Sequence, residues 1–259
     1  MTILDKELFV VSQGLSEVQV YDSMEFSFSR HWNLKELMYP YDIGSSSRLK
    51  CLYILDFKGS NHSSEILRVD SNGKLMKKWS TGDDSVWAMS VTEESNVILT
   101  VSADSILKEY SPDGELIRDI LISPHSGIRH PCQAVKLATG YFVVSHGYYG
   151  DDLHRVCLMD PGGNCKKLFG GKCGSGNGRL NLPVQLAVDE NGYVMVVDRW
   201  NSRVLLLDSN LRFKRVIISN VRNPELRFPW KILVDESTGR LVVADNEWND
   251  GRILIFQFK

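Results

Sequence analysis

The sequence predicts an all-β protein: a six-bladed β-propeller of four-stranded antiparallel blades, with an irregular first or last blade. Three observations predict it. Similar segments recur about every 46 residues, each repeat holds several short apolar runs, and Gly, Asn, Asp and Pro separate those runs. No ten-residue stretch keeps a 3.6-residue period without a turn residue breaking it, so a helical interpretation fails. On this interpretation residues 1–259 form a single propeller domain.

Five apolar segments mark the starts of repeats, and their first residues are 45, 46, 52 and 46 positions apart. The segments are Pro40–Ile43, Ser85–Met89, Pro131–Val135, Pro183–Ala187 and Pro229–Leu233. A second apolar run ends 15 to 17 residues after each start. These runs are Leu52–Asp56, Val97–Ser102, Tyr141–His146, Tyr193–Asp198 and Arg240–Asp245.

A third run follows a variable loop, and a more polar fourth run closes the repeat. The third runs are Glu65–Asp70, Ile106–Ser111, Arg155–Asp160, Arg203–Asp208 and Arg252–Gln257. The fourth, as in Lys74–Ser80 or Arg212–Ile218, alternates apolar with charged residues, which is typical of an exposed edge strand. All runs are rich in Val, Ile, Leu and Tyr and therefore favour β-strands.

The two ends of the chain supply the remaining strands. Leu8–Gln13, Val18–Asp22 and Glu25–Trp32 match the second, third and fourth strands of a further unit, with Met1–Leu4 as a shortened first strand. The last unit stops at Lys259 after its third strand. We therefore expect six blades, with either an incomplete last blade or a closing strand borrowed from the other end.

Composition limits the classes of partner. The net charge of −2 and the pI near 6.3 provide no bulk attraction for nucleic acid or an anionic membrane, so we expect no DNA and no membrane partner. No apolar stretch approaches the roughly 18 residues of a membrane span, and the first residues lack a signal-peptide pattern. The five cysteines contain no C-x-x-C pair, which favours reduced thiols and a cytoplasmic location.

Residues 169–208 resemble an NHL repeat, the module found at the C-terminus of tripartite-motif proteins. They read FGGKCGSGNGRLNLPVQLAVDENGYVMVVDRWNSRVLLLD, with a Gly-rich approach, Pro, Ala-Val-Asp, Asn-Gly, Val-Val-Asp and Asn-x-Arg-Val. The last unit follows the same pattern from Phe228 to Ile253, and the other units match more loosely. The resemblance implies a six-bladed propeller that binds protein or RNA, with an enzymatic minority in the family.

Two motifs have structural interpretations that we prefer. Asp198 with Arg203, and Asp245 with Arg252, lie at the end of a second strand and the start of a third, where a carboxylate and a guanidinium can pair across the loop. The segment Gly170–Arg179 lacks the Gly-Lys-Ser/Thr of a phosphate loop and precedes a strand, so we interpret it as a blade connection that needs positive φ angles.

Ligand-binding candidates come first from the innermost strands. In a propeller the first strand of each blade faces the central channel, and the position two residues after each aligned start forms a ring at its mouth. With one residue of uncertainty in the second of these units, the ring contains Asp42, Trp87, Gln133, Gln185 and Lys231. These side chains are mostly polar and varied, which suits either a ligand site or the wall of a water-filled channel.

Aromatic residues form the second group of candidates. Trp87 and Trp230 lie just inside first strands, with Tyr41 in the same region, and Trp200 and Trp248 lie in loops between second and third strands. Exposed loop aromatics are favoured as interface anchors, although they also pack loops. Trp32 and Trp79 fall in fourth strands and are interpreted as packing residues.

The histidines suggest a further possibility, a metal site. His146 takes the place that aspartate fills in other repeats, and His130, Cys132 and His146 could approach one another as ligands of zinc. No HExxH or other compact spacing supports a metal site, and no Gly-x-Ser-x-Gly elbow supports a nucleophile. We expect no cofactor.

The sequence therefore favours a binding propeller over an enzyme. It would recognise a protein or a small ligand through its blade-connecting loops and its second-to-third-strand loops. One alternative is an RNA-binding domain using Arg199, Arg203, Arg222 and Lys231. Another is a metal-dependent hydrolase or lyase using His130, His146, Asp42 and Gln133.

Overall fold

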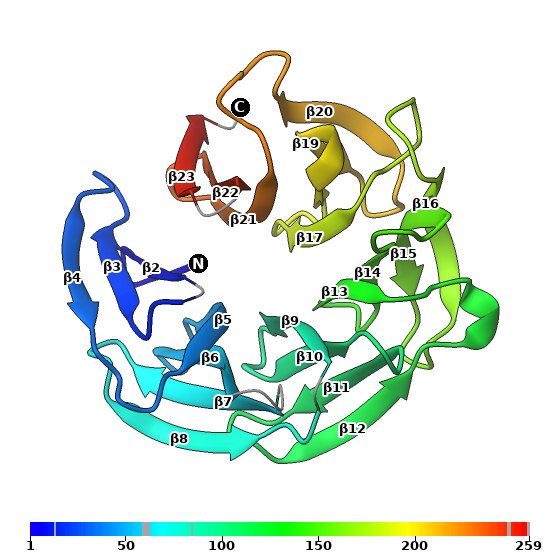
Figure 1. Cartoon of the computed structure of the whole chain (residues 1–259). Coiled ribbons are helices and arrows are strands. Elements are labelled where there is room, and N and C mark those ends of the chain that lie inside the picture. The colour runs from blue at the N-terminus through cyan, green and yellow to red at the C-terminus, as the bar shows by residue number, and fades with distance from the viewer. Residues whose placement is uncertain (13, 59–62, 84, 248–249, 258–259) are drawn as a thin grey trace. The chain divides into compact units, whose positions relative to one another are not determined.

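The structure is a computed structural model that describes residues 1–12, 14–58, 63–83, 85–247 and 250–257. Its strands form six antiparallel sheets that follow one another along the sequence, and the fold is a six-bladed β-propeller (Figure 1). The chain divides into two compact units, residues Met1–Val101 with Lys108–Asp119 and residues Ser102–Leu107 with Ile120–Lys259.

The first unit contains two complete blades and most of a third. The first blade consists of β1 (Thr2–Leu4), β2 (Glu7–Val11), β3 (Val18–Asp22) and β4 (Phe28–Trp32). The second consists of β5 (Tyr39–Ser46), β6 (Cys51–Lys58), β7 (Ser63–Asp70) and β8 (Leu75–Ser80). The third consists of β9 (Val86–Val91), β10 (Val97–Val101), β11 (Ile106–Tyr110) and β12 (Leu116–Leu121), of which β11 and β12 extend into the second unit.

The second unit contains the other three blades. The fourth consists of β13 (Pro131–Lys136), β14 (Phe142–His146), β15 (Leu153–Met159) and β16 (Cys165–Lys172). The fifth consists of β17 (Pro183–Val188), β18 (Val194–Asp198), β19 (Arg203–Leu207) and β20 (Phe213–Ser219). The last consists of β21 (Pro229–Asp235), β22 (Arg240–Glu247) and β23 (Asp250–Gln257). Two short 3₁₀ helices, η2 (Pro124–Ser126) and η3 (Arg199–Asn201), lie in connections.

The predicted fold class is confirmed, and strands lie at the predicted positions within the described residues. Gln13, the end of the predicted run Leu8–Gln13, lies outside the described residues. The shortened strand at the N-terminus exists as β1 and pairs with β2. Of the two expectations for the last blade, the sheets match the incomplete one, because within the described residues β21, β22 and β23 form a sheet of three strands in which no N-terminal strand is paired. The strand-borrowing alternative is therefore wrong for this part of the chain.

Apolar residues are buried between neighbouring blades of each unit. In the first unit one core joins the first two blades and includes Phe9, Val18, Ile54 and Leu67. In the second unit one core joins the fourth and fifth blades and another joins the fifth and last. The burial gradient follows the predicted strand order, since β10 is buried throughout whereas most of β12 is exposed or half-buried. Burial of apolar surface on both faces explains why inner strands are continuously apolar.

Two fourth-strand tryptophans pack against turns of the next blade, as predicted for packing residues. A Cβ on Gly73 would lie only 2.7 Å from the nearest atom of the Trp32 ring. Trp79 has the same relation to Gly114, at 2.6 Å. Both glycines have positive φ, +82° and +81°, so these turns require glycine for conformation and for space.

Candidate functional site

The first strands share a β-bulge that defines the candidate positions. In the five blades with an aligned start, one residue near the beginning of the first strand has no partner opposite it on the second strand, and regular pairing then resumes. The residues at the bulge are Tyr41, Trp87, Cys132, Val184 and Trp230. The residues that resume pairing are Asp42, Ala88, Gln133, Gln185 and Lys231.

This register corrects one member of the predicted ring. Trp87 lies at the bulge with Tyr41 and Trp230, and Ala88 takes the place equivalent to Asp42. The aligned start in this repeat is Val86, paired with Val101, rather than Ser85. The one-residue difference arises because this repeat has no proline to mark its start.

Two of the ring residues form hydrogen bonds to the first strand of the next blade. The side chain of Asp42 is buried, and its Oδ2 accepts a hydrogen bond from the backbone N–H of Met89, at 3.1 Å. In the second unit the Oε1 of Gln133 accepts the backbone N–H of Leu186 in the same way. Both acceptors bind the residue that follows the ring position of the next blade, so Asp42 and Gln133 join neighbouring first strands.

The other two polar ring positions lack this contact. Gln185 is only 6% exposed, and no described protein group hydrogen-bonds its Oε1. Lys231 carries an ammonium group, which donates hydrogen bonds but does not accept them. Part of the Lys231 side chain reaches solvent, yet protein surrounds it closely enough that burial lowers its pKa to about 7. Because β17 lies against β21, these two ring positions occupy neighbouring strands.

Buried aspartates at the ends of second strands anchor the loops, and the two predicted ion pairs are confirmed. Oδ2 of Asp198 accepts from Nε of Arg203, and Oδ2 of Asp245 accepts from an Nη of Arg252, both at 2.7 Å. Asp198 also accepts the backbone N–H of Asn181, and Asp245 that of Phe228. Burial raises the pKa of Asp198 although these donors oppose the shift. The recurring pair fixes the approach to each first strand.

His146 replaces this aspartate in the fourth blade. It pairs in register with Arg155, as Asp198 does with Arg203. The His146 ring is 1% exposed, no described group hydrogen-bonds its Nε2, and burial, followed by the nearby Arg155 charge, lowers its pKa to about 4. His146 is therefore neutral near neutral pH.

The proposed metal candidates lie in the fourth blade but show separate contacts. Nδ1 of His130 lies 3.0 Å from a carboxylate oxygen of Asp151. Burial raises the pKa of the Cys132 thiol to about 12, so this thiol keeps its proton near neutral pH. Within the described residues no three His, Cys, Asp or Glu side chains are grouped to hold a metal ion.

His154 is a buried polar residue to which the sequence assigned no role. Its Nδ1 accepts the backbone N–H of Leu182, at 2.7 Å, so in the neutral ring the proton is on Nε2. Gly147 lies against the ring, because a Cβ there would be 2.7 Å from Cδ2 of His154. His154 therefore joins the fourth blade to the approach to the fifth, and no motif of spacing or residue type could have indicated this contact.

A cluster of aromatic rings around one guanidinium is the most distinctive surface of the second unit. The Arg199 guanidinium lies 4.7 Å from the centre of the Trp230 ring and 5.7 Å from that of Phe228. Trp200 meets Phe228 edge to face, at 6.0 Å between ring centres, and is 47% exposed. We call Arg199, Trp200, Phe228 and Trp230 the Arg199–Trp230 surface. It brings together two predicted binding residues, Trp200 and Trp230.

Hydrogen bonds hold the backbone below this surface. The N–H of Trp200 donates to the carbonyl of Asn181, and the guanidinium of Arg199 donates to the carbonyls of Phe228 and Asn246. The hydroxyl of Ser202 donates to the carbonyl of Arg227. Helix η3 is thus attached both to the approach to β17 and to the approach to β21, and the exposed ring stands on a fixed support.

Other aromatic residues lie at the start of a first strand or in a loop between second and third strands. In the first unit Tyr41 meets Phe57 edge to face at 5.1 Å, and Tyr39 is 51% exposed. In the second unit Tyr149, in the loop between β14 and β15, is 81% exposed. Trp248 lies outside the described residues.

The Gly-rich connection has the conformation expected of it. Gly170 and Gly178 have positive φ, +103° and +71°, and a Cβ on Gly170 would lie 2.4 Å from the carbonyl oxygen of His154. The end of the segment is tied to the ion pair, since the carbonyl of Arg179 accepts from the Arg203 guanidinium. Gly170, Gly171 and Lys172 end strand β16, and residues 173–179 form the blade connection that the sequence predicted for the whole of Gly170–Arg179.

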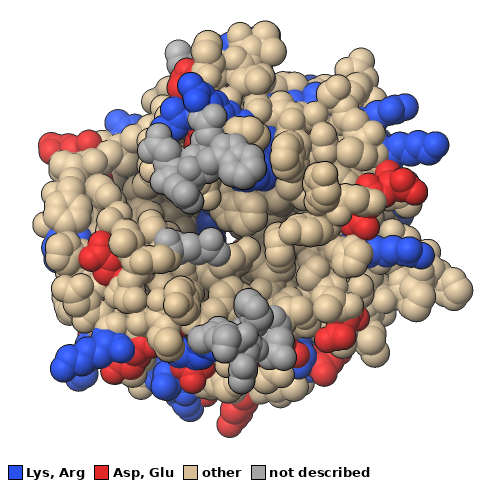
Figure 2. Space-filling view, viewed as in Figure 1, with Lys and Arg blue, Asp and Glu red and all other residues tan. Residues whose placement is uncertain are grey.

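Charges of both signs are interspersed on the face in Figure 2, where no continuous surface of one sign is visible. Of the basic residues considered for RNA, Arg203 is engaged with Asp198 and with backbone carbonyls. Arg199 is stacked within the aromatic cluster. In the described part of the chain no helix is long and apolar enough to span a membrane.

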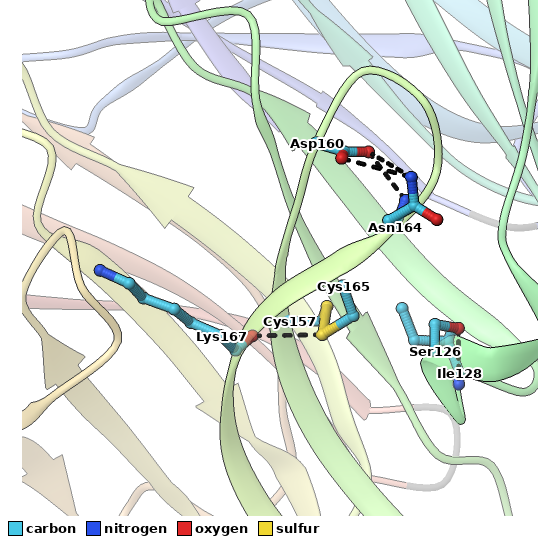
Figure 3. Close-up of a disulfide and its surroundings, with 7 residues drawn as sticks. All are labelled: Ser126, Ile128, Cys157, Asp160, Asn164, Cys165 and Lys167. Atoms are coloured by element: carbon cyan, nitrogen blue, oxygen red, sulfur yellow. Dashed lines mark hydrogen bonds between the residues drawn. A yellow bond between two sulfur atoms is a disulfide. The ribbon is translucent and has the colours of Figure 1, made fainter.

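A disulfide joins Cys157 to Cys165, contrary to the expectation that all thiols are reduced (Figure 3). The two cysteines are on adjacent antiparallel strands, β15 and β16, where Met159 pairs with Cys165. Cys51, Cys132 and Cys173 remain free thiols. The bridge closes the turn between β15 and β16, in which Asp160 accepts hydrogen bonds from the backbone N–H groups of Gly162 and Asn164.

Comparison with known proteins supports the fold and leaves the family open. No protein-family model and no curated protein matches the chain. A solved structure of a protein of unknown function from Bacteroides caccae matches 94% of this chain and 84% of its own, with a TM-score of 0.68 and 12% identity. A chain of the nidogen/laminin complex matches 97% of this chain and 92% of its own, with a TM-score of 0.66 and 14% identity.

Virginiamycin B lyase from Staphylococcus aureus also matches, over 98% of this chain and 83% of its own, with a TM-score of 0.61 and 12% identity. At such identities the likeness concerns the fold alone. These structural neighbours are β-propeller proteins, and so is this chain.

Proposed function

We propose that this chain is a protein-binding propeller whose recognition surface is the Arg199–Trp230 surface. The observation that carries the proposal is the exposure of Trp200, at 47%, on a backbone held by hydrogen bonds from both sides. Tryptophan and arginine dominate the residues that contribute most to binding at protein interfaces, and a rigid anchor loses little conformational entropy on binding. An exposed ring of this kind is suited to burial by a partner.

The chemistry around the ring indicates the type of partner. The Arg199 guanidinium lies over the Trp230 ring, and Arg179 and Arg227, whose backbone carbonyls accept hydrogen bonds from Arg203 and Ser202, are exposed. Guanidinium groups beside an aromatic ring complement carboxylates next to an apolar side chain. The partner we propose is therefore a protein with an acidic segment that carries an aromatic or aliphatic anchor.

The NHL resemblance supports the same proposal. We propose that the repeats are of the NHL type, on the motif in residues 169–208, and that family implies binding of protein or RNA. One structural neighbour was solved in a nidogen/laminin complex, which is an assembly of proteins. RNA has less support, because the Arg203 guanidinium is already held by Asp198. For a metal-dependent hydrolase or lyase, the described residues offer no grouped set of ligands in support.

A matched pair of variants tests the proposal. Trp200→Ala removes the central ring, whereas Phe213→Ala removes a comparably exposed ring (51%) from the fourth strand of the same blade. Binding would be measured against an array of acidic peptides that carry one aromatic residue, with lysine-for-glutamate versions as charge controls. We expect Trp200→Ala to weaken the best peptide about 10-fold or more and Phe213→Ala to change it little. Equal binding by both variants, or a preference for the basic peptides, would overturn the proposal.

A further inference from the structure

Strand β23 has an open edge within the described residues. In each of the five other blades a fourth strand pairs with the third, whereas the last sheet has the order β21-β22-β23 and β23 pairs with β22 alone. The open edge is the one that β4, β8, β12, β16 and β20 cover in the other blades (Figure 1). Backbone N–H and C=O groups along such an edge can pair with a further strand.

Strand β23 has the composition of an inner strand rather than that of an edge strand. Its residues 253–256 are an uncharged apolar run, and Ile255 is 42% exposed. The equivalent residues 204–207 of the fifth blade are all buried. Each of the five fourth strands, by contrast, carries at least one charged residue, which protects an exposed edge against unwanted pairing. The sequence of β23 therefore fits a strand that another strand covers.

The fourth strands of the first, second, fourth and fifth blades share a residue pattern at this edge. Opposite the position equivalent to Phe256 they have an apolar residue, in turn Phe28, Leu75, Cys165 and Phe213. Opposite the position of Ile255 they have a basic residue, in turn Arg30, Lys77, Lys167 and Arg215. Opposite the position of Ile253 they have a large apolar residue, in turn Trp32, Trp79, Phe169 and Ile218.

The same bulge accompanies the pattern. In these four strands one residue between the apolar and the basic position has no partner on the third strand, in turn Ser29, Met76, Lys166 and Lys214. The third blade has the same spacing in Leu116, Arg118 and Ile120, and Arg118 pairs with Glu109 on the third strand. A strand that covers this edge thus reads apolar–x–basic–x–large apolar, with one residue more before the last position in the fifth blade.

We propose that the open edge of β23 binds an extended segment of a partner protein that carries this pattern. The occupant follows from the interface that the same edge forms in every other blade. The segment runs antiparallel to β23 and completes the sheet through backbone hydrogen bonds, with its large apolar residue opposite Ile253. Its basic residue lies opposite Ile255 and extends towards solvent, as the exposed Lys77 does opposite Arg68.

This edge is a second binding site, and it does not depend on the function proposed above. The Arg199–Trp230 surface lies in loops and takes an acidic segment, whereas the edge of β23 takes a basic one by strand pairing. The two sites therefore differ in the charge of the segment and in the part of the fold that receives it. A basic segment that bound at the loops would contradict this separation.

A peptide with the sequence of one fourth strand is the probe. Residues 73–81, Gly-Lys-Leu-Met-Lys-Lys-Trp-Ser-Thr, contain the complete pattern. A fluorescent version would be titrated with the full chain and followed by anisotropy. We expect saturable binding, and we expect glycine in place of the peptide's tryptophan to weaken it about 10-fold or more. Absence of saturable binding below about 1 mM, or equal binding by the glycine peptide, would overturn the proposal.

Backbone methylation distinguishes strand pairing from unspecific apolar contact. Successive N–H groups of a strand point to opposite edges, so only one of two adjacent groups faces β23. Two peptides, N-methylated at the first or at the second of the adjacent lysines, should therefore differ at least about 10-fold in affinity. Hydrogen exchange of the full chain should slow in residues 250–257 when the unmodified peptide binds. Equal affinity of the two methylated peptides, or slowed exchange elsewhere but not in β23, would overturn the proposal.

Variants of the chain assign the edge. Ile255→Lys places a charge opposite the basic residue of the peptide and should weaken binding about 10-fold or more, whereas Leu168→Lys changes a comparably exposed residue (47%) in β16 and should change little. Trp200→Ala should keep the affinity of the wild type. If Ile255→Lys does not fold, the methylated peptides decide. A dimer of the wild type that Ile255→Lys converts to a monomer would assign the edge to a second copy of the chain and overturn the proposal.

Discussion

His146 lies directly opposite Arg155 across β14 and β15, at the register position where Asp198 faces Arg203 and Asp245 faces Arg252. The fourth blade therefore has the arginine of the repeated ion pair but a histidine in place of its carboxylate. A neutral imidazole fills the place, and its Nε2 has no hydrogen-bonding partner among the described protein groups.

We predict that His146→Asp stabilises the protein at neutral pH. An aspartate would pair with Arg155 and accept a backbone N–H at the approach to β13, as Asp198 does at the approach to β17. Urea unfolding at pH 7.5 should show a gain of about 1 kcal/mol, with His146→Asn gaining less because it lacks the charge. Destabilisation by His146→Asp with Asn tolerated would show that the histidine pocket cannot hold the pair.

Acid should destabilise the wild-type protein through the same residue. The pKa of His146 is lowered to about 4 in the folded state, so between pH 6.5 and 4 the unfolded chain binds a proton that the folded chain does not. The free energy of unfolding should therefore fall as the pH falls through this window and level off below it, with a contribution of up to about 3 kcal/mol. His146→Gln should flatten that part of the profile in urea titrations from pH 7 to 4. An identical pH slope in the variant would assign the acid sensitivity to other groups.

The ion pair of the fifth blade should be essential for stability. Asp198→Asn removes the charge that holds Arg203 and presents an amide donor to a guanidinium, so we expect a loss of about 3 kcal/mol. The control is Glu7→Gln, which breaks the more exposed Glu7–Arg30 pair and should cost less than about 1 kcal/mol. Equal effects of the two substitutions on the urea midpoint would contradict the anchoring role of Asp198.

Alanine substitutions at two turn glycines can separate the stability cost of backbone strain from that of a steric clash. Gly114 and Gly140 share a φ of +81°, but a Cβ would meet Trp79 only at Gly114, while nothing lies within 4 Å at Gly140. We predict a loss of about 1 kcal/mol for Gly140→Ala and about 1–3 kcal/mol more for Gly114→Ala. Chemical unfolding of both variants gives the difference. Equal losses would place Trp79 away from this turn.

Reduction of the Cys157–Cys165 disulfide should lower stability modestly. The bridge spans eight residues, and closing so short a loop restricts the unfolded chain by about 2 kcal/mol. A thiol reductant should lower the melting temperature of the wild type but leave the double variant Cys157→Ser/Cys165→Ser unchanged. A wild-type melting temperature insensitive to reduction would show that the bridge does not form in solution.

The sequence was sufficient to predict the blades, because turn residues and apolar runs recur with the repeat. It was also sufficient for the Asp198–Arg203 pair, whose two residues flank one loop. The sequence placed Trp87 instead of Ala88 in the ring of channel-mouth positions, because the bulge at Trp87 is visible only in strand pairing. The disulfide was missed for a related reason: the approach of Cys157 to Cys165 depends on a register shift between Leu158 and Met159.

The sequence could not predict which side chains form hydrogen bonds or ring contacts with a neighbouring blade. Asp42, Gln133 and Gln185 look equivalent in the aligned repeats, yet two of them bind the next strand and Gln185 does not. That difference depends on contacts between blades, which no linear spacing encodes. Arg199 likewise reads as one basic residue among several, and only the fold places it on the rings of Phe228 and Trp230.

The central claim, that the Arg199–Trp230 surface binds a protein, is tested most directly by site-specific photocrosslinking. A photoreactive phenylalanine analogue would replace Trp200 in one version of the chain and Phe213 in another, each expressed in cells that naturally contain the protein. We predict a discrete crosslinked protein from position 200 that Arg199→Ala suppresses, and none from position 213. The same crosslinked species from both positions, or none from position 200, would contradict the claim.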